Sequence, residues 1–211
     1  DVKSKKYLGK SVLIAVNLIN TKVSKKLKGS NIHDQERIDT ILINLDGSRQ
    51  KVKFGANAIL AVSMAVKKLS AKIKKLPLYK TFLIKNNFQL PYPLMNIING
   101  GAHANNGLRI QEFMIRPDKA KTFSEAMRIC FIVINNLRDL IKKKKLSTSV
   151  GDEGGFAPMI DNNEQALDLI VAAIKKSGFI NGKDVSICLD VAANELYKGN
   201  KYSIHSKKLI S

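Results

Sequence analysis

Apolar residues recur every three to four positions through three stretches of the first part of the chain, residues 4–28, 33–46 and 55–75. That spacing places apolar side chains on one face of a helix, so each stretch is predicted to be helical. In the third stretch, residues 56–66 are apolar on nearly every face, and we expect them to be buried. Together the three stretches predict a helical domain over residues 1–83.

The pattern changes beyond residue 84. Short apolar runs with β-branched residues flank a glycine-rich segment, which predicts two strands around a loop. Two longer amphipathic stretches follow, and their spacing is typical of helices. After them, apolar residues alternate with smaller or polar ones over residues 184–191. The residues from 194 on show no clear core role. Strands alternating with helices predict an α/β domain over residues 84–211. Its predicted strands are residues 93–98, 111–115 and 184–191, and its predicted helices are residues 123–145 and a stretch that ends near residue 176.

Composition limits the class of protein. With 211 residues, 45% of them hydrophobic, the chain can bury a sizeable core. No apolar run approaches the length that spans a bilayer. Cys130 and Cys188 each lie inside an apolar run, as small buried hydrophobes of a reducing compartment do. The chain opens on Asp1 without a methionine, so we expect a processed or partial polypeptide.

The net charge of +19 has two interpretations, a nucleic-acid binder and a solvated lysine-rich surface. The lysines are spread over several clusters, at residues 22–28, 67–75 and 142–145. Aromatic residues are only 6% of the chain and do not alternate with the lysines, so stacking platforms for bases are not evident. This favours the solvated surface, with nucleic-acid binding as the alternative.

Four residues suggest chemistry. Glu153 follows Asp152 in a segment with three glycines, which let a backbone approach a ligand closely, although an acidic surface turn would look the same. His103, in a loop with little to bury, could carry a proton, contact a phosphate or simply be solvated. Glu112 is a carboxylate inside an apolar strand, either reactive or structurally paired. Asp190, at the end of a strand, could bind a metal or cap the following turn. Their joint placement in loops and at strand ends favours an α/β enzyme with an acidic, metal-dependent site.

Five motifs strengthen this interpretation through a family resemblance. They are FGANAILAVS (residues 54–63), PLMNIINGG (93–101), IQEFMI (110–115), VGDEGGFAP (150–158) and CLDVAANE (188–195). In their order and spacing these motifs resemble the enolase family, over essentially residues 1–204. The resemblance implies an α/β fold class: the helical part of the enolase N-terminal domain, followed by the first part of an enolase-type eight-stranded α/β barrel, which is incomplete.

The resemblance also implies an activity. Enolases (phosphopyruvate hydratases) are magnesium-dependent lyases of glycolysis in the cytoplasm, and they reversibly dehydrate 2-phosphoglycerate to phosphoenolpyruvate through a magnesium-stabilised enolate. Glu153 matches the family's catalytic acid for the departure of hydroxide. Glu112 matches the second catalytic glutamate, which lies beside the leaving group and also contacts substrate. His103 and Gln111 match substrate-binding positions, and Asp190 matches the first of three carboxylates that bind Mg²⁺.

The resemblance covers about half of an enolase. It implies that the first strands, most of the barrel, the lysine base and the other two metal carboxylates are missing here, so we expect the 211-residue chain alone to be inactive. The family further implies a homodimer or larger homo-oligomer. The chain departs from the family in its positive charge, at Asn194, where serine is usual, and at Arg109. If Arg109 points inward, it would lower the pKa of Glu112. The competing hypothesis is a non-catalytic enolase piece whose basic surface binds nucleic acid.

Overall fold

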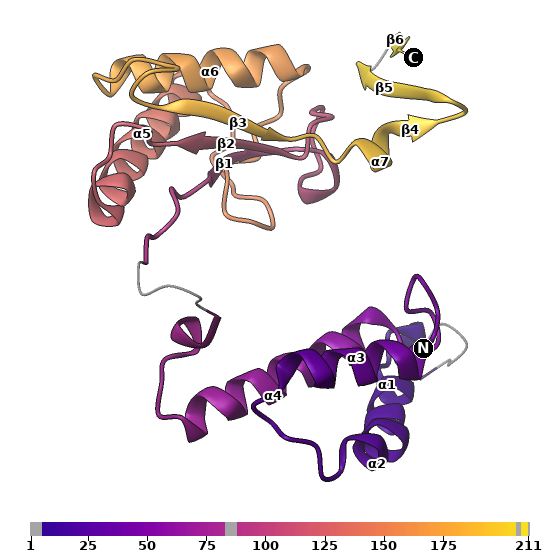
Figure 1. Cartoon of the computed structure of the whole chain (residues 1–211). Helices are drawn as coiled ribbons and strands as arrows, with labels where there is room; N and C mark the ends of the chain where they lie inside the picture. The colour runs from indigo at the N-terminus through magenta and orange to yellow at the C-terminus, as the bar shows by residue number, and fades with distance from the viewer. Residues whose placement is uncertain (1–5, 83–87, 206–207, 211) are drawn as a thin grey trace. The chain divides into compact units, whose positions relative to one another are not determined.

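The computed structural model describes residues 6–82, 88–205 and 208–210. The chain divides into two compact units, Asp1–Asn87 and Phe88–Ser211. Figure 1 shows the first as a group of helices and the second as a sheet with helices packed on it. The domain boundary predicted between residues 83 and 84 lies outside the described residues.

Helices build the N-terminal unit. The second predicted helix is confirmed as α3 (Gln35–Asp46): Asp34 Oδ1 accepts a hydrogen bond from Arg37 N at 3.1 Å before it, and Gly47 ends it with a φ of 65°. The first predicted helix begins later than expected, at Leu13, because residues of η1 with positive φ interrupt it. The other elements of this unit are η1 (Lys6–Gly9), α1 (Leu13–Leu18), the π-helical η2 (Ile19–Val23), α2 (Ser24–Leu27), α4 (Ala56–Ile73) and η3 (Leu78–Phe82).

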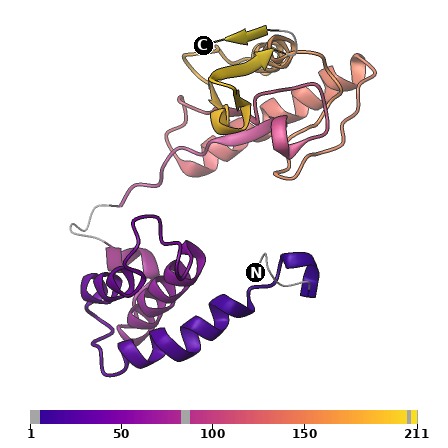
Figure 2. The ribbon, with the colours of Figure 1, turned by 90° about the vertical axis from the view of Figure 1, so that its right-hand side faces the viewer.

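The core of this unit is small. Its buried cluster consists of Val23, Ile38 and Leu42, with a few partly buried neighbours. The expectation that residues 56–66 are buried is wrong, because the side chain of Leu60 is 58% exposed and that of Met64 is 48% exposed. Within the described part of the unit, α4 packs mainly against α3 and also contacts α1 and η3; Figure 2 shows the helices of this unit grouped together.

A buried carboxylate holds the loop that joins α3 to α4. Asp46 Oδ1 accepts hydrogen bonds from Ser48 N at 2.9 Å and from Ser48 Oγ, and Oδ2 accepts from Lys53 N at 3.1 Å and Phe54 N at 2.8 Å. Burial alone would raise the pKa of this carboxyl group. The four donors outweigh burial and lower the pKa of Asp46 to about 2.

The C-terminal unit has a large core. Side chains of three strands and two long helices form one buried cluster, in which Phe113, Leu137 and Ile170 have no exposed surface. The helix α5 begins after Thr122, whose side chain accepts a hydrogen bond from Glu125 N, and α6 begins after Asn162 in the same way. The predicted strands and helices are present as β1 (Met95–Asn99), β2 (Glu112–Arg116), α5 (Phe123–Lys143), α6 (Asn163–Lys176) and β3 (Ser186–Asp190).

The topology of the sheet determines where the candidate residues lie. The strand order is β1-β2-β3, with both pairs antiparallel, so β1 and β3 end at the edge where β2 begins. Asn99, Glu112 and Asp190 lie directly opposite one another at that edge. The three strands do not close into a barrel within the described residues, as expected for an incomplete one.

The end of the chain has more structure than the sequence predicted. The short helix α7 (Ala193–Leu196) leads into an antiparallel sheet of β4 (Tyr197–Lys198), β5 (Lys201–His205) and β6 (Lys208–Ile210). Asn163 Nδ2 donates to Ile204 O at 3.4 Å and so joins this sheet to the start of α6. Among the helices of the described ranges, none combines the length and the apolar composition needed to cross a membrane.

Candidate functional site

The site is built at the edge of the sheet where β1 and β3 end. Glu112 is the first residue of β2, and Asp190 is the last residue of β3. Because β2 runs against both neighbours, the start of one strand and the end of another meet, and the two carboxylates lie on adjacent strands. The sequence predicted both as candidates but not that they would be cross-strand neighbours.

The glycine loop after β1 brings the histidine to this edge. Gly100 N donates to Gln111 O at 2.9 Å and Gly101 N donates to Leu108 O at 3.1 Å, so the loop folds back onto the residues before β2. A Cβ on Gly100 would lie 2.4 Å from Ile110 O, which only glycine avoids. The short helix η4 (Gly101–His103) then places His103 Nδ1 at 3.5 Å from Glu112 Oε1.

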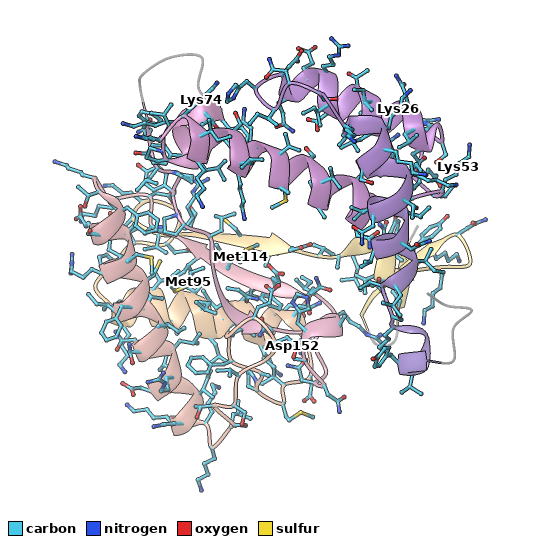
Figure 3. All side chains as sticks on the ribbon, turned by 90° about the horizontal axis from the view of Figure 1, so that it is seen from below. Lys26, Lys53, Lys74, Met95, Met114 and Asp152 are labelled. Carbon is cyan, nitrogen blue, oxygen red and sulfur yellow. The ribbon has the colours of Figure 1, made fainter. Side chains whose placement is uncertain are left out.

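A second glycine loop, residues 150–156, supplies the other glutamate. Phe156 N donates to Ile97 O and Asn99 N donates to Phe156 O, both at 2.9 Å, which fixes the end of the loop beside β1. Asp152 N donates to His103 O at 3.3 Å, so this loop also contacts η4. Figure 3 labels Asp152, the neighbour of Glu153, in this loop close to the strand ends. Glu153 Oε2 lies 3.8 Å from His103 Nδ1.

Three segments that are distant in the sequence therefore bring His103, Glu112 and Glu153 together. One ligand atom of each lies within 4.8 Å of the others. Burial raises the pKa of Glu112, and the hydrogen bond and charge of Glu153 and the charge of Asp190 raise it further, while His103 acts in the opposite direction. Glu112 thus keeps its proton at a higher pH than a free glutamate does, as an acid group beside a second carboxylate should.

Asp190 and Gln111 border this cluster without joining it. Asp190 is exposed, and its Oδ1 accepts a hydrogen bond from Ala192 N at 2.9 Å, so the turn-capping role considered from the sequence is present. Its second carboxylate oxygen remains able to bind a cation. Gln111 lines an open cavity of about 980 Å³ next to the cluster, between the loop of residues 101–109 and the segment Ala192 to Leu196.

Arg109 does not take the inward position considered from the sequence. Its side chain is exposed and lines the same cavity, and it is absent from the groups that shift the pKa of Glu112. Asn194, the other departure from the family pattern, lies in α7, four residues after Asp190.

Sequence reasoning missed two asparagines of the site. Asn96 and Asn99 lie on β1, inside a run that was considered only for its apolar residues, and Asn99 has no exposed surface. Asn96 Nδ2 lies 3.5 Å from Glu153 Oε2. The available signal was a pair of amides in an apolar strand, because buried amides are costly unless they form hydrogen bonds.

In comparison with known proteins, both units of the chain match one family. Residues 1–82 match the family model described as "Enolase, N-terminal domain", and residues 87–210 match "Enolase, C-terminal TIM barrel domain". The chain is 83% identical to the protein named "Enolase" of Pelagibacter ubique (strain HTCC1062), over all 211 of its residues. It spans 50% of the length of that relative.

Proposed function

Because this chain belongs to the enolase family, we propose that it is the part of an enolase that carries the acid groups for the reversible dehydration of 2-phosphoglycerate to phosphoenolpyruvate. The observation that supports this best is the convergence of His103, Glu112 and Glu153, from three separate segments, within 4.8 Å. A histidine between two carboxylates in a partly open site is suited to moving a proton.

The two glutamates divide the work by their surroundings. Glu153 has a side chain that is 47% exposed, so it can reach a substrate and donate the proton that turns a departing hydroxide into water. Glu112, at 15% exposure, lies deeper and contacts the leaving group from beside Glu153. His103 and Gln111 bind the substrate, His103 from the loop that lies over the strand edge. We expect the lysine base that removes the substrate proton to come from the half of the enolase that this chain does not span.

Asp190 is the residue that we assign to the divalent metal, Mg²⁺. Its exposed carboxylate is the oxygen ligand that Mg²⁺ prefers, whereas His103 offers a nitrogen better suited to transition metals. When bound, the metal supplies positive charge against the negative charge that develops on the substrate. We expect chelation of divalent ions to abolish turnover of an assembled enzyme and added Mg²⁺ to restore it. Glycolytic function, a cytoplasmic location and a homodimer or larger homo-oligomer belong to the same proposal.

A chimera tests this proposal. The 211-residue chain would replace the matching half of the Pelagibacter enolase, whose 83% identity favours correct packing at the junctions. We expect the chimera to convert 2-phosphoglycerate to phosphoenolpyruvate and the 211-residue chain alone to be inactive, since Asp190 is its single assigned metal ligand. Turnover by the isolated chain, or a folded chimera without turnover, would contradict the proposal.

Substitutions in the chimera then test the roles. Glu153→Gln keeps the shape of the side chain but removes its acid group, so we expect kcat to fall by about 10²- to 10⁴-fold. Asp152→Asn is the matched control, because it makes the same chemical change in the neighbouring exposed residue, which contacts the site through its backbone. Equal losses in the two variants would show that the loop, and not Glu153, is responsible.

A further inference from the structure

Two amide side chains connect the candidate acid to the backbone. Asn96 and Asn99 lie on β1, and Asn99 is fully buried opposite Glu112. Asn99 Nδ2 donates a hydrogen bond to Gly155 O at 3.1 Å, and Asn96 Nδ2 donates to Asn99 Oδ1. The same Asn96 Nδ2 lies 3.5 Å from Glu153 Oε2, as a long hydrogen bond. These contacts form one chain from the carbonyl of Gly155 to the carboxylate of Glu153.

The carbonyl at one end sets the direction of the whole chain. A backbone oxygen can only accept, so Gly155 O requires the nitrogen of Asn99 to face it. Asn99 Oδ1 must then face Asn96, and Asn96 must present its nitrogen to both Asn99 and Glu153. Turning either amide by 180° would place two acceptors against each other. The carbonyl of Gly155, which lies on the same loop as Glu153, therefore determines that Asn96 presents its N–H donor to Glu153.

Glycines let the loop lie close enough for these contacts. A Cβ on Gly151 would be 2.3 Å from Asn99 Nδ2 and 2.7 Å from His103 O. A Cβ on Gly155 would be 3.1 Å from Asn96 Oδ1 and 3.0 Å from backbone atoms of Ile97 and Ile98. Gly151 N also donates to Gly155 O at 2.8 Å, so the carbonyl that orients the amides also closes the loop.

We propose that Asn96 and Asn99 are positioning residues that hold Glu153 Oε2 through this chain of amides. This inference rests on the proposed function. Asn96 Nδ2 and His103 Nδ1 both lie on the side of Oε2, which leaves Oε1 as the oxygen that passes its proton to the leaving hydroxyl group. The O–H bond of Glu153 and the C–O bond of the substrate then break, and the departing hydroxyl takes the proton and leaves as water. The electron pair left on the substrate by the earlier removal of its proton forms the C=C bond of phosphoenolpyruvate, and Glu153 remains as a carboxylate. Hydrogen bonds of this kind are long in free enzymes and shorten when substrate is bound.

The first test uses the chimera. Asn96→Leu keeps the number and branching of the side-chain heavy atoms but has no donor, so we expect kcat to fall by about 10- to 100-fold with KM changed by less than about 3-fold, as for a group used in the chemical step. Asn136→Leu is the matched control: its amide joins α5 to Ser177 Oγ at 2.9 Å, far along the chain from the site, and kcat should not change.

A double variant separates positioning from a general structural defect. If Asn96 acts through Glu153, then Asn96→Leu combined with Glu153→Gln should be no slower than Glu153→Gln alone, because residues that act as a unit are not additive. Losses that multiply in the double variant, or an equal loss in Asn136→Leu, would overturn the proposal.

A measurement without turnover keeps the two proposals apart. In NMR spectra of the 211-residue chain, the side-chain NH₂ signals of Asn96 and Asn99 should be protected from exchange with water, and Glu153→Gln should shift that of Asn96. Asp152→Asn should leave it unchanged. An inactive chimera with these shifts would refute the proposed catalytic role of the site and leave the amide chain intact. If the Asn96 NH₂ protons exchange rapidly and their signals do not shift in the Glu153→Gln variant, the amide chain is refuted.

Discussion

The two units of this chain differ in how they use their apolar and charged residues. The C-terminal unit buries side chains from three strands and two helices in one cluster, whereas the N-terminal unit buries three in its own. Both units leave some large apolar residues exposed, such as Leu8 at 90% in the first and Phe131 at 66% in the second, so the difference lies in the size of the buried cluster. The candidate site lies entirely in the unit with the large core, where packing can hold carboxylates at fixed separations.

The two units also differ in net charge. Residues 1–87 contain 19 Lys and Arg against 5 Asp and Glu, a net +14, whereas residues 88–211 contain 17 against 12, a net +5. Ion pairs such as Lys119–Asp184 and Lys176–Asp139 occur in the C-terminal unit. In the described residues of the N-terminal unit, no lysine or arginine lies within salt-bridge distance of a carboxylate. Within the described residues, carboxylate partners of lysine and arginine therefore occur in the C-terminal unit.

The largest expected effect comes from making one substitution in both units. Leu137→Ala, at a side chain with no exposed surface in α5, should reduce the free energy of unfolding by about 2–5 kcal/mol. Leu60→Ala, at the 58% exposed side chain in α4, should change it by less than about 0.5 kcal/mol. Urea unfolding of the chain, monitored separately for each unit, measures both. Equal costs would mean that α4 is as well covered as α5.

The next effect concerns the loop that carries Glu153. Gly151→Ala would bring a methyl group within 2.3 Å of Asn99 Nδ2, so the loop must move and kcat of the chimera should fall by at least about 10-fold. Gly154→Ala, three residues on, has a positive φ but open space around it. It should cost about 1–2 kcal/mol of stability and leave most of the turnover. A chimera that tolerates Gly151→Ala equally well would show that close approach is unnecessary.

Much of this arrangement could be predicted from the sequence. The family assignment and the α/β fold class with an incomplete barrel are confirmed. Periodicity located α3, α5 and β2 because each has a covered face that imposes its spacing. The prediction that residues 56–66 are buried was wrong, because an apolar helix is buried only if other elements pack over it. The residue pattern of one helix does not show whether they do.

The site was predictable only in part. Glycine loops and a carboxylate in an apolar strand identified His103, Glu112 and Glu153 as candidates, because such residues break the local pattern. Their distances depend on the antiparallel register of β1, β2 and β3, which no single stretch of sequence specifies. The contacts of Asn96 and Asn99 could not be predicted for the same reason, since their partners, Glu153 and Gly155, lie more than fifty residues away in the sequence.

The acids of the two units should respond to pH in opposite directions. Asp46 in the N-terminal unit has a folded-state pKa of about 2, below its ordinary 3.8, so its contribution to stability is complete above about pH 4 and is lost as the pH falls towards 2. Glu112 in the C-terminal unit has a raised pKa, so its contribution to stability is lost as the pH rises above its ordinary 4.5. Unfolding of each unit between pH 2 and 7 measures both slopes.

Neutral replacements serve as controls for this pH dependence. Asp46→Asn should flatten the acid slope of the N-terminal unit, and Glu112→Gln should flatten the opposite slope of the C-terminal unit. Slopes of the same sign in both units would contradict the environments described for these two carboxylates.

The smallest expected effect concerns the unpaired charge of the N-terminal unit. Lys22, Lys25 and Lys26 line one surface hollow beside Thr21 and Leu45, and Figure 3 labels Lys26 on that unit. Replacing all three with glutamine should leave turnover of the chimera unchanged and should shift its unfolding midpoint little, because exposed charges contribute little to stability.

The same variant decides the competing hypothesis of a nucleic-acid binder. A charged surface without stacking aromatics should bind single-stranded RNA only at low salt, with log affinity falling steeply as log salt rises. Binding that persists at moderate salt and is lost with these three lysines would make the N-terminal unit, too, a functional surface.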